Sequence, residues 1–150
     1  MAIKLDMSKA YDRVEWLFLE VMMRKLSFHE RWISWMIMCV TTISYVLING
    51  ELRGKIIPSR GIRQEDPILP YLFLLCVEGL FAMLRKEERA GKLRGVSIYR
   101  SAPQISHLLF ANDYIIFCRA TVEEGRHVIN VLKEYERGSG QKLNKEKTSL

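Results

Sequence analysis

Two aspartates, Asp6 and Asp113, stand where this chain could carry out metal chemistry. Asp6 belongs to segment 3–7, in which apolar and polar residues alternate, so the apolar side chains should face a core while Asp6 projects to the opposite side of a strand. Asn112 and Asp113 separate two apolar runs rich in strand formers, which predicts a hairpin with these residues at its tip. A hairpin tip can hold a carboxylate rigidly and leave it open to metal. Asn-Asp is also ordinary turn chemistry, because Asn tolerates left-handed backbone angles, so the hairpin alone leaves a structural and a functional interpretation open.

Four blocks of the sequence together resemble the reverse transcriptases of non-LTR retrotransposons, in particular the LINE-type elements abundant in plant genomes. The blocks occur in the family's order: KLDMSKAYDRVEW at 4–16, GIRQEDPILPYLF at 61–73, HLLFAND at 107–113 and GSGQKLNKEKTS at 138–149. One block would be weak evidence, whereas four in order are specific. The resemblance implies an RNA-directed DNA polymerase whose partners are an RNA template, a DNA primer and deoxynucleoside triphosphates.

The resemblance also implies a two-metal site. In such polymerases two Mg²⁺ ions, roughly 3.5 to 4 Å apart, clamp the attacking and leaving oxygens, and Mg²⁺ prefers oxygen ligands. The family's first-strand aspartate matches Asp6, and the second aspartate of its hairpin pair matches Asp113. The first hairpin aspartate is replaced by Asn112, an amide that offers a neutral oxygen and no charge. We therefore expect impaired Mg²⁺ binding and impaired catalysis, because the site depends on that charge.

Further roles are implied for four other residues. By resemblance, Arg63 and Gln64 shape the pocket for the incoming nucleotide and the templating base. Tyr11 matches the aromatic residue that excludes ribonucleotides by crowding the 2′ hydroxyl, and Lys147 matches the lysine that donates a proton to the leaving pyrophosphate. Without the family, Tyr11 would be interpreted as packing, Arg63 as a solvated loop charge and Lys147 as a surface lysine.

The second block departs from the family pattern in a way that should also impair catalysis. Glu65 stands where the family has a glycine, and it brings bulk and negative charge to the place where template and nucleotide should lie. The resemblance further predicts that residues 1–150 form a single partial domain, the palm, because the family's fingers precede the first block and its thumb follows the last.

Composition is typical of one globular unit. The chain has 150 residues, of which 49% are hydrophobic, enough to bury one core. A net charge of +6 and a pI near 9.3 suit a nucleic-acid partner. For the basic group at 85–94, a solvated helix face and a binding surface remain equally open.

The three cysteines show no zinc-type spacing and lie in apolar runs, where buried, reduced thiols are expected. No signal peptide or transmembrane segment is recognisable, so an intracellular protein of nucleus or cytoplasm with no membrane partner is expected, and no feature indicates an oligomeric state.

The pattern of elements predicts an α+β domain, reverse transcriptase palm-like, with a mainly antiparallel sheet and helices packed on one face. The first predicted element is a strand at 3–7. Two helices follow: the first has a buried face that holds Val14, Leu17, Phe18, Val21 and Met22, and the second has a capping box at 27–30 and core residues Trp32, Trp35 and Met36.

The remaining predicted elements are two hairpins and two helices. The hairpins turn at Asn49-Gly50 and around 112–113. One helix spans 67–90 and is stopped by Gly91, and the other runs from about 121 to 136 and is ended by Gly138.

Function can be predicted at the same level. We expect a reverse transcriptase-like palm, an RNA-directed DNA polymerase by descent and catalytically impaired. The alternatives are a non-catalytic nucleic-acid-binding protein that uses the same open sheet face, and a non-functional retroelement relic.

Overall fold

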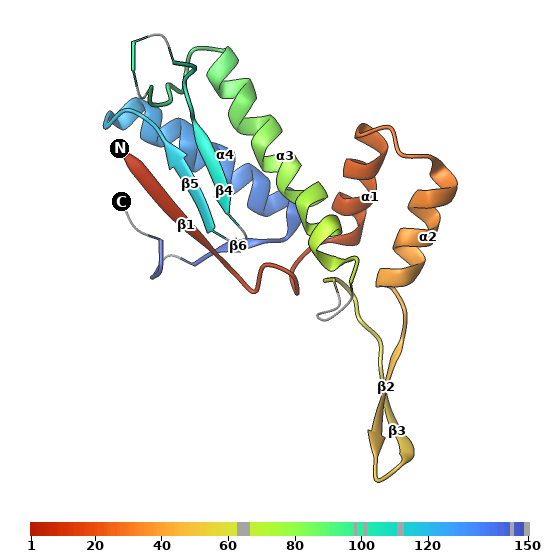
Figure 1. Cartoon of the computed structure of the whole chain (residues 1–150). Helices are drawn as coiled ribbons and strands as arrows, with labels where there is room; N and C mark the ends of the chain where they lie inside the picture. The colour runs from red at the N-terminus through yellow and green to blue at the C-terminus, as the bar shows by residue number, and fades with distance from the viewer. Residues whose placement is uncertain (63–66, 98, 101, 111–112, 145, 149–150) are drawn as a thin grey trace.

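A four-stranded antiparallel sheet lies at one side of the molecule, and α1 (Trp16–Lys25) and α2 (Glu30–Val40) lie at the other (Figure 1). The computed structural model describes residues 1–62, 67–97, 99–100, 102–110, 113–144 and 146–148. In the sheet the strands have the order β4-β5-β1-β6, and they comprise β1 (Ala2–Ser8), β4 (His107–Phe110), β5 (Asp113–Phe117) and β6 (Lys142–Leu143). The predicted α+β class with an antiparallel sheet is confirmed.

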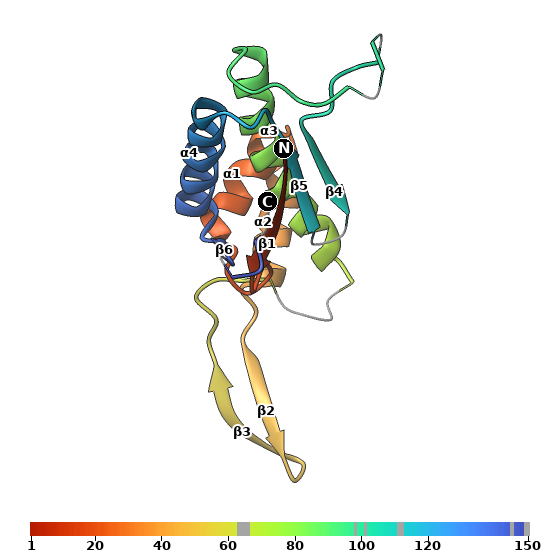
Figure 2. The ribbon, with the colours of Figure 1, turned by 90° about the vertical axis from the view of Figure 1, so that its left-hand side faces the viewer.

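Two long helices, α3 (Leu69–Arg89) and α4 (Val122–Ser139), cover one face of this sheet (Figure 2). The alternation of β1 points Ile3, Leu5 and Met7 into that covered face, where they are buried. Tyr114 of β5 is buried in the same core. The other face of the sheet carries Lys4, Asp6 and their cross-strand neighbours and has no helix over it, so the polar residues of β1 remain accessible.

Two shorter helices, α1 (Trp16–Lys25) and α2 (Glu30–Val40), pack beside the first half of α3 and enclose a second core cluster. The helix at this position was predicted correctly, and Val14 and Met22 are buried as expected, but two of its five predicted core residues are exposed. Leu17 is 70% exposed and Val21 is also exposed, whereas Leu19 and Met23 are completely buried. Apolar residues surround α1 on almost every side, so only the position of its neighbours decides which face is covered.

The start of α2 also differs from the prediction. Ser27 has a left-handed φ of 62° and does not cap the helix. The N-cap is His29, whose Nδ1 accepts a hydrogen bond from the Arg31 amide at 3.2 Å. Trp35, expected in the core, is 47% exposed, and the Arg31 guanidinium lies 4.9 Å from its ring centroid.

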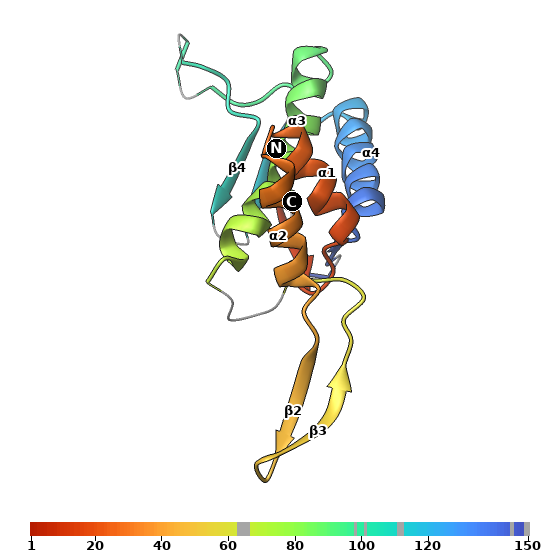
Figure 3. The same ribbon diagram turned by 90° about the vertical axis from the view of Figure 1, so that its right-hand side faces the viewer.

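A separate hairpin of β2 (Ser44–Ile48) and β3 (Glu51–Ile56) extends away from the helices (Figure 3). Its turn has positive φ at Asn49 and Gly50, as the Asn-Gly signal predicts. All six residues of β3 are exposed. The hairpin therefore contributes little to either core, and apolar side chains such as Tyr45, Ile48 and Leu52 lie open.

Helix α4 is longer than predicted. Thr121 caps it as expected, with its side chain accepting from the Glu124 amide. The helix continues through Gly138 to Ser139 and ends at Gly140, which has the left-handed φ of 77° that such a cap requires. Among the described residues no helix is long and apolar enough to cross a bilayer.

Candidate active site

Asp6 and Asp113 are direct cross-strand partners in the β1·β5 ladder. Residues opposite each other in an antiparallel pair project to the same face, with Cβ atoms about 4.5 to 5.5 Å apart. Both side chains are partly exposed on the uncovered face of the sheet. The structure thus brings together two carboxylates from opposite ends of the chain, as the resemblance implied, while their chemical role stays a prediction.

Lys4 shares this open face. Its Nζ lies 3.2 Å from Asp113 Oδ2, and the two side chains are 52% and 48% exposed. Together with Leu108, Leu109 and Ile115, this pair lines a shallow pocket of about 410 Å³. The Lys4 ammonium partly compensates the negative charge of the two carboxylates. This ion pair could not be predicted from the sequence, because the β1·β5 register is what places Lys4 diagonally across from Asp113.

Several predicted site residues lie outside the described part of the chain. These are Arg63, Gln64 and Asn112, together with the substituted Glu65. Their predicted roles remain as the resemblance gives them.

Tyr11 connects two of the four sequence blocks. Its ring packs against Phe73 with centroids 4.6 Å apart, and its carbonyl accepts a hydrogen bond from the Ile62 amide at 2.9 Å. The backbone that leads into Arg63 is thereby fixed beside Tyr11. Tyr11 is half-buried. The packing interpretation therefore accounts for the buried part of the ring, and the function of its exposed part stays a prediction.

Lys147 lies in a turn that is attached to β1, the strand that carries Asp6. The Asn144 amide donates to the Asp6 carbonyl at 2.9 Å, and Asn144 Oδ1 accepts from the amides of Glu146 and Lys147 at 3.2 and 3.4 Å. The turn therefore begins beside Asp6. Lys147 itself is exposed, free to reach a ligand or to remain a surface lysine.

A buried polar network beneath the site was missed in the sequence. Gln141 is completely buried; its Nε2 donates to the Ala10 carbonyl at 3.0 Å, and its Oε1 accepts from the Tyr135 hydroxyl at 2.9 Å. Burial raises the pKa of Tyr135 far above its ordinary value, so this hydroxyl stays a donor. Gln141 belongs to the fourth block, and that membership was the one available signal. The network holds the backbone immediately before Tyr11.

The charge available to a cation is limited. Throughout the described ranges no group of three or more His, Cys, Asp or Glu side chains could hold a metal ion. Asp6 and Asp113 nevertheless fit the chemistry of Mg²⁺, which proteins often bind through one or two carboxylates completed by substrate phosphates and water. The donor set therefore suits an ion that arrives with a phosphate ligand better than an ion bound by protein alone.

Comparison with known proteins gives one family. The chain matches the family described as reverse transcriptase (RNA-dependent DNA polymerase) over residues 1–150. An uncharacterized mitochondrial protein of Arabidopsis thaliana is 48% identical over 67 residues, which are 45% of this chain and 55% of that protein.

Longer relatives match across almost all of the sequence. The transposon TX1 uncharacterized 149 kDa protein of Xenopus laevis is 26% identical over 98% of this chain and 11% of its own length. The retrovirus-related Pol polyprotein from the type-1 retrotransposable element R2 of Popillia japonica is 24% identical over 97% of this chain and 23% of its own length. The chain thus spans a small part of these two relatives.

The fold is similar to that of a solved telomerase. Telomerase from Candida albicans, in complex with a fragment of telomeric RNA, superposes with a TM-score of 0.69 at 13% identity, covering 99% of this chain and 26% of that chain. At this identity the likeness supports the palm-like architecture.

Proposed function

This chain belongs to the reverse transcriptase (RNA-dependent DNA polymerase) family, and we propose that Asp6 and Asp113 form a degenerate nucleotidyl-transfer site in which Asn112 weakens Mg²⁺ binding. The chain is a reverse transcriptase-like domain with non-LTR retrotransposon relatives. The observation that carries the proposal is the cross-strand pairing of the two aspartates on the open face of the sheet.

Each residue has a defined task in this proposal. Asp6 and Asp113 would hold the Mg²⁺ ions, which when bound polarise the triphosphate and lower the pKa of the primer hydroxyl. Asn112 can offer only a neutral oxygen. Tyr11 would exclude a ribose 2′ hydroxyl.

Three more residues act around this centre. Arg63 and Gln64 would orient the nucleotide against the templating base, and Lys147 would give a proton to the leaving pyrophosphate. The proposed partners are an RNA template, a DNA primer and deoxynucleoside triphosphates, met in the nucleus or cytoplasm.

We also propose that residues 1–150 supply the palm, while polymerisation requires fingers and thumb in addition. Two apolar surfaces support this. The first is the exposed β2–β3 hairpin. Because an isolated two-stranded hairpin is marginally stable, contact with a further domain would stabilise it. The other is an open pocket of about 630 Å³ between α2 and α3, lined by Phe28, Trp32, Tyr71 and Leu74 among others.

Metal binding tests the site directly. Mn²⁺ binding, followed by electron paramagnetic resonance with a deoxynucleoside triphosphate present, should weaken in Asp6→Ala and Asp113→Ala and strengthen in Asn112→Asp. A control substitution, Glu134→Ala on the exposed side of α4, should change nothing. If Asp6→Ala and Asp113→Ala bind Mn²⁺ as the unmodified chain does, the proposed site is wrong.

Primer extension tests the impairment. With Mg²⁺ and Mn²⁺ assayed separately, we expect no incorporation by the purified chain, and none by Asn112→Asp, because the bulk and negative charge of Glu65 would still oppose nucleotide binding. Measurable incorporation by the unmodified chain would refute the impairment and leave an active polymerase.

A non-catalytic nucleic-acid-binding protein is the second candidate, and the Lys4–Asp113 ion pair favours it because an ammonium already neutralises part of the carboxylate charge. Binding should then be independent of sequence and weaken steeply with salt. Charge reversal at Arg63, Lys142 and Lys145 together should weaken it more than alanine at Asp6 and Asp113. A chain that retains no primer–template at low salt and micromolar concentration, or cannot be kept folded, would be a relic.

A further inference from the structure

The segment between α3 and β4 reaches away from the sheet as a loop with a fixed base. Figures 2 and 3 show it extending beyond the edge of β4. At the base, Val96 and Ile105 exchange two backbone hydrogen bonds of 2.9 Å. Gly95 is required there, because a Cβ atom at this position would lie 2.3 Å from the Ile105 carbonyl oxygen. The loop is thus held at its base, which lowers the entropy lost when its exposed residues bind a partner.

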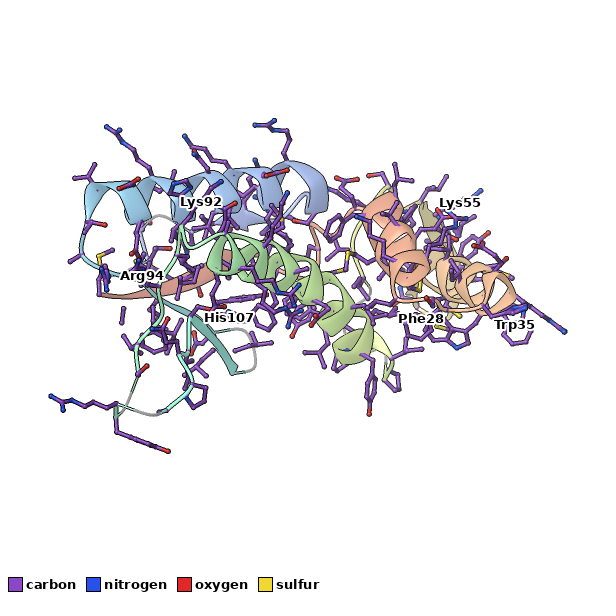
Figure 4. The ribbon with its side chains drawn as sticks, turned by 90° about the horizontal axis from the view of Figure 1, so that it is seen from above. Phe28, Trp35, Lys55, Lys92, Arg94 and His107 are labelled. Carbon is purple, nitrogen blue, oxygen red and sulfur yellow. The ribbon has the colours of Figure 1, made fainter. Side chains whose placement is uncertain are left out.

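Glu124 fastens the same base to the end of β5. Its Oε2 accepts hydrogen bonds from the Arg94 amide at 3.2 Å and from the Arg119 amide at 2.9 Å. Two arginines from different segments therefore have neighbouring backbones, and both side chains are exposed. Figure 4 shows Lys92 and Arg94 at the end of the molecule opposite Phe28 and Trp35.

The exposed end of the loop adds an aromatic ring and a third arginine. Tyr99 is 66% exposed and Arg100 is exposed beside it. A hydrogen bond of 3.0 Å from the Ala102 amide to the Tyr99 carbonyl closes the turn that carries them. Tyrosine next to arginine offers one group that stacks on a base and one that binds a phosphate.

The positive charge of this region exceeds its negative charge, because the nearby Glu124 carboxylate binds the backbone amides of Arg94 and Arg119 and supplies a single negative charge. The sequence contains no Asp or Glu between Arg89 and Asn112. Within the described residues Arg94, Arg100 and Arg119 form no ion pair, whereas Arg53 and Arg60 each lie beside a glutamate at 2.9 and 3.5 Å. Lys92 is partly neutralised by Glu87 at 3.8 Å, so the arginines carry the available charge.

We propose that Arg94, Arg100 and Arg119, with Tyr99, form a second nucleic-acid contact, separate from the aspartate pair and directed at the phosphate backbone. The proposal rests on the proposed nucleic-acid partner. Arg119 follows Asp113 by six residues along and beyond β5, which at about 3.3 Å per residue is roughly 20 Å. A duplex that passes the aspartates would meet the arginines roughly six base steps away, at about 3.4 Å per step.

The salt dependence of duplex binding tests this contact. A labelled DNA duplex of roughly 12 base pairs or more, long enough to reach both places, is titrated at several salt concentrations. Replacing Arg94, Arg100 and Arg119 together by alanine should make the slope of log K against log salt less steep by about two to three, since each lost phosphate contact removes about 0.9. The matched control replaces Arg126, Lys133 and Arg137 on the exposed side of α4 by alanine, which removes the same charge and should change the slope by less than about one.

Tyr99→Ala separates stacking from charge. It should weaken binding of a single strand on the order of ten-fold with an unchanged slope, because stacking on an aromatic ring involves no counterion release. The three arginine side chains lie outside the cores, and circular dichroism and urea unfolding would show whether the triple variant is folded. If the triple variant is unstable, the single variant Arg100→Glu at the loop tip replaces it and should also make the slope of log K against log salt less steep.

Three outcomes would overturn the proposal. Equal slope changes in the triple variant and its matched control would mean that only net charge matters. Loss of binding to phosphatidylserine vesicles with unchanged duplex binding would identify a membrane partner. No duplex binding by the unmodified chain would remove the contact, while the aspartate site would be judged separately by Mn²⁺ binding without nucleic acid.

Discussion

The ammonium of Lys4 lies 3.2 Å from Asp113 Oδ2 and competes with any cation for that carboxylate. We expect Lys4→Met to strengthen Mn²⁺ binding by at most about five-fold, because exposed ion pairs contribute only roughly 0 to 1 kcal/mol. Isothermal titration calorimetry with and without a deoxynucleoside triphosphate would measure it. Lys133→Met, which removes an equal charge from the exposed side of α4, should have no comparable effect; equal gains in both variants would contradict a local competition.

Gln141 satisfies two buried polar groups at once, so its removal should be costly. Gln141→Leu keeps the volume but leaves the Ala10 carbonyl without its side-chain donor. It also removes one of two acceptors of the Tyr135 hydroxyl, which keeps the Cys76 carbonyl at 3.3 Å. We expect the free energy of unfolding to fall by about 1 to 3 kcal/mol, mainly because the Ala10 carbonyl is left buried without its donor. Urea unfolding of Gln141→Leu, Tyr135→Phe and the double variant would measure the coupling. Additive losses would show that the two side chains act independently.

Gly125 within α4 and Gly140 at its C-cap should respond oppositely to alanine. Gly140 has φ 77°, and a Cβ atom there would lie 2.5 Å from the Arg13 carbonyl oxygen, so Gly140→Ala should lower the free energy of unfolding by more than about 1 kcal/mol. Gly125 has nothing within 4 Å of the same added atom. Because alanine is the better helix former, Gly125→Ala should raise the free energy of unfolding by up to about 1 kcal/mol.

This pair of variants is its own control, since both receive one methyl group in or beside one helix. Urea unfolding monitored by circular dichroism gives both values. A loss at Gly125 as large as that at Gly140 would mean that the C-cap and its contact with Arg13 have no special weight.

Local sequence patterns predicted where helices and turns lie better than they predicted which side chains are buried. Asn49-Gly50 and Gly91 mark real ends because backbone angles are decided by residue type. The buried face of α1 could not be predicted, since Leu17 and Leu19 are equally apolar and only α3 and α2 determine which is covered. The burial of Gln141 could not be predicted because its partner Ala10 is 131 residues away.

The candidate site shows the same division. Alternation predicted that Asp6 lies opposite the core, and the turn signal placed Asp113 at a strand end. Their pairing is a long-range contact for which no local pattern exists, and only the family resemblance supplied it. The ion pair between Lys4 and Asp113 follows from the register of the β1·β5 pairing, so it could not be predicted from the sequence.

Thiol accessibility reports on packing of the whole molecule. Cys76 and Cys118 are buried as expected, but Cys39 is exposed at the end of α2, contrary to the prediction. Burial raises the pKa of Cys76 to about 12 and also raises the pKa of Cys118, so both have little thiolate near pH 8. We expect one fast-reacting thiol with a disulfide reagent in the native chain and three after denaturation.

Cys39→Ser should remove the fast reaction and leave the two slow ones. Their rates would then measure opening of the core, since a buried thiol reacts only when its surroundings open. Rapid reaction of all three thiols in the native chain would contradict the packing of α3 and β5 described above.

The position of β1 in the sheet has a consequence for synthesis. It lies between β5 and β6, so both of its edges are paired with residues made more than 100 positions after it. At translation rates of about 5 to 20 residues per second, the nascent strand waits roughly 5 to 30 s for its partners. During that time an apolar strand with two open edges emerges from the ribosome, a template for misassociation. We therefore expect the yield of folded chain in cells to depend on chaperones that shield β1, independently of the stability of the finished sheet.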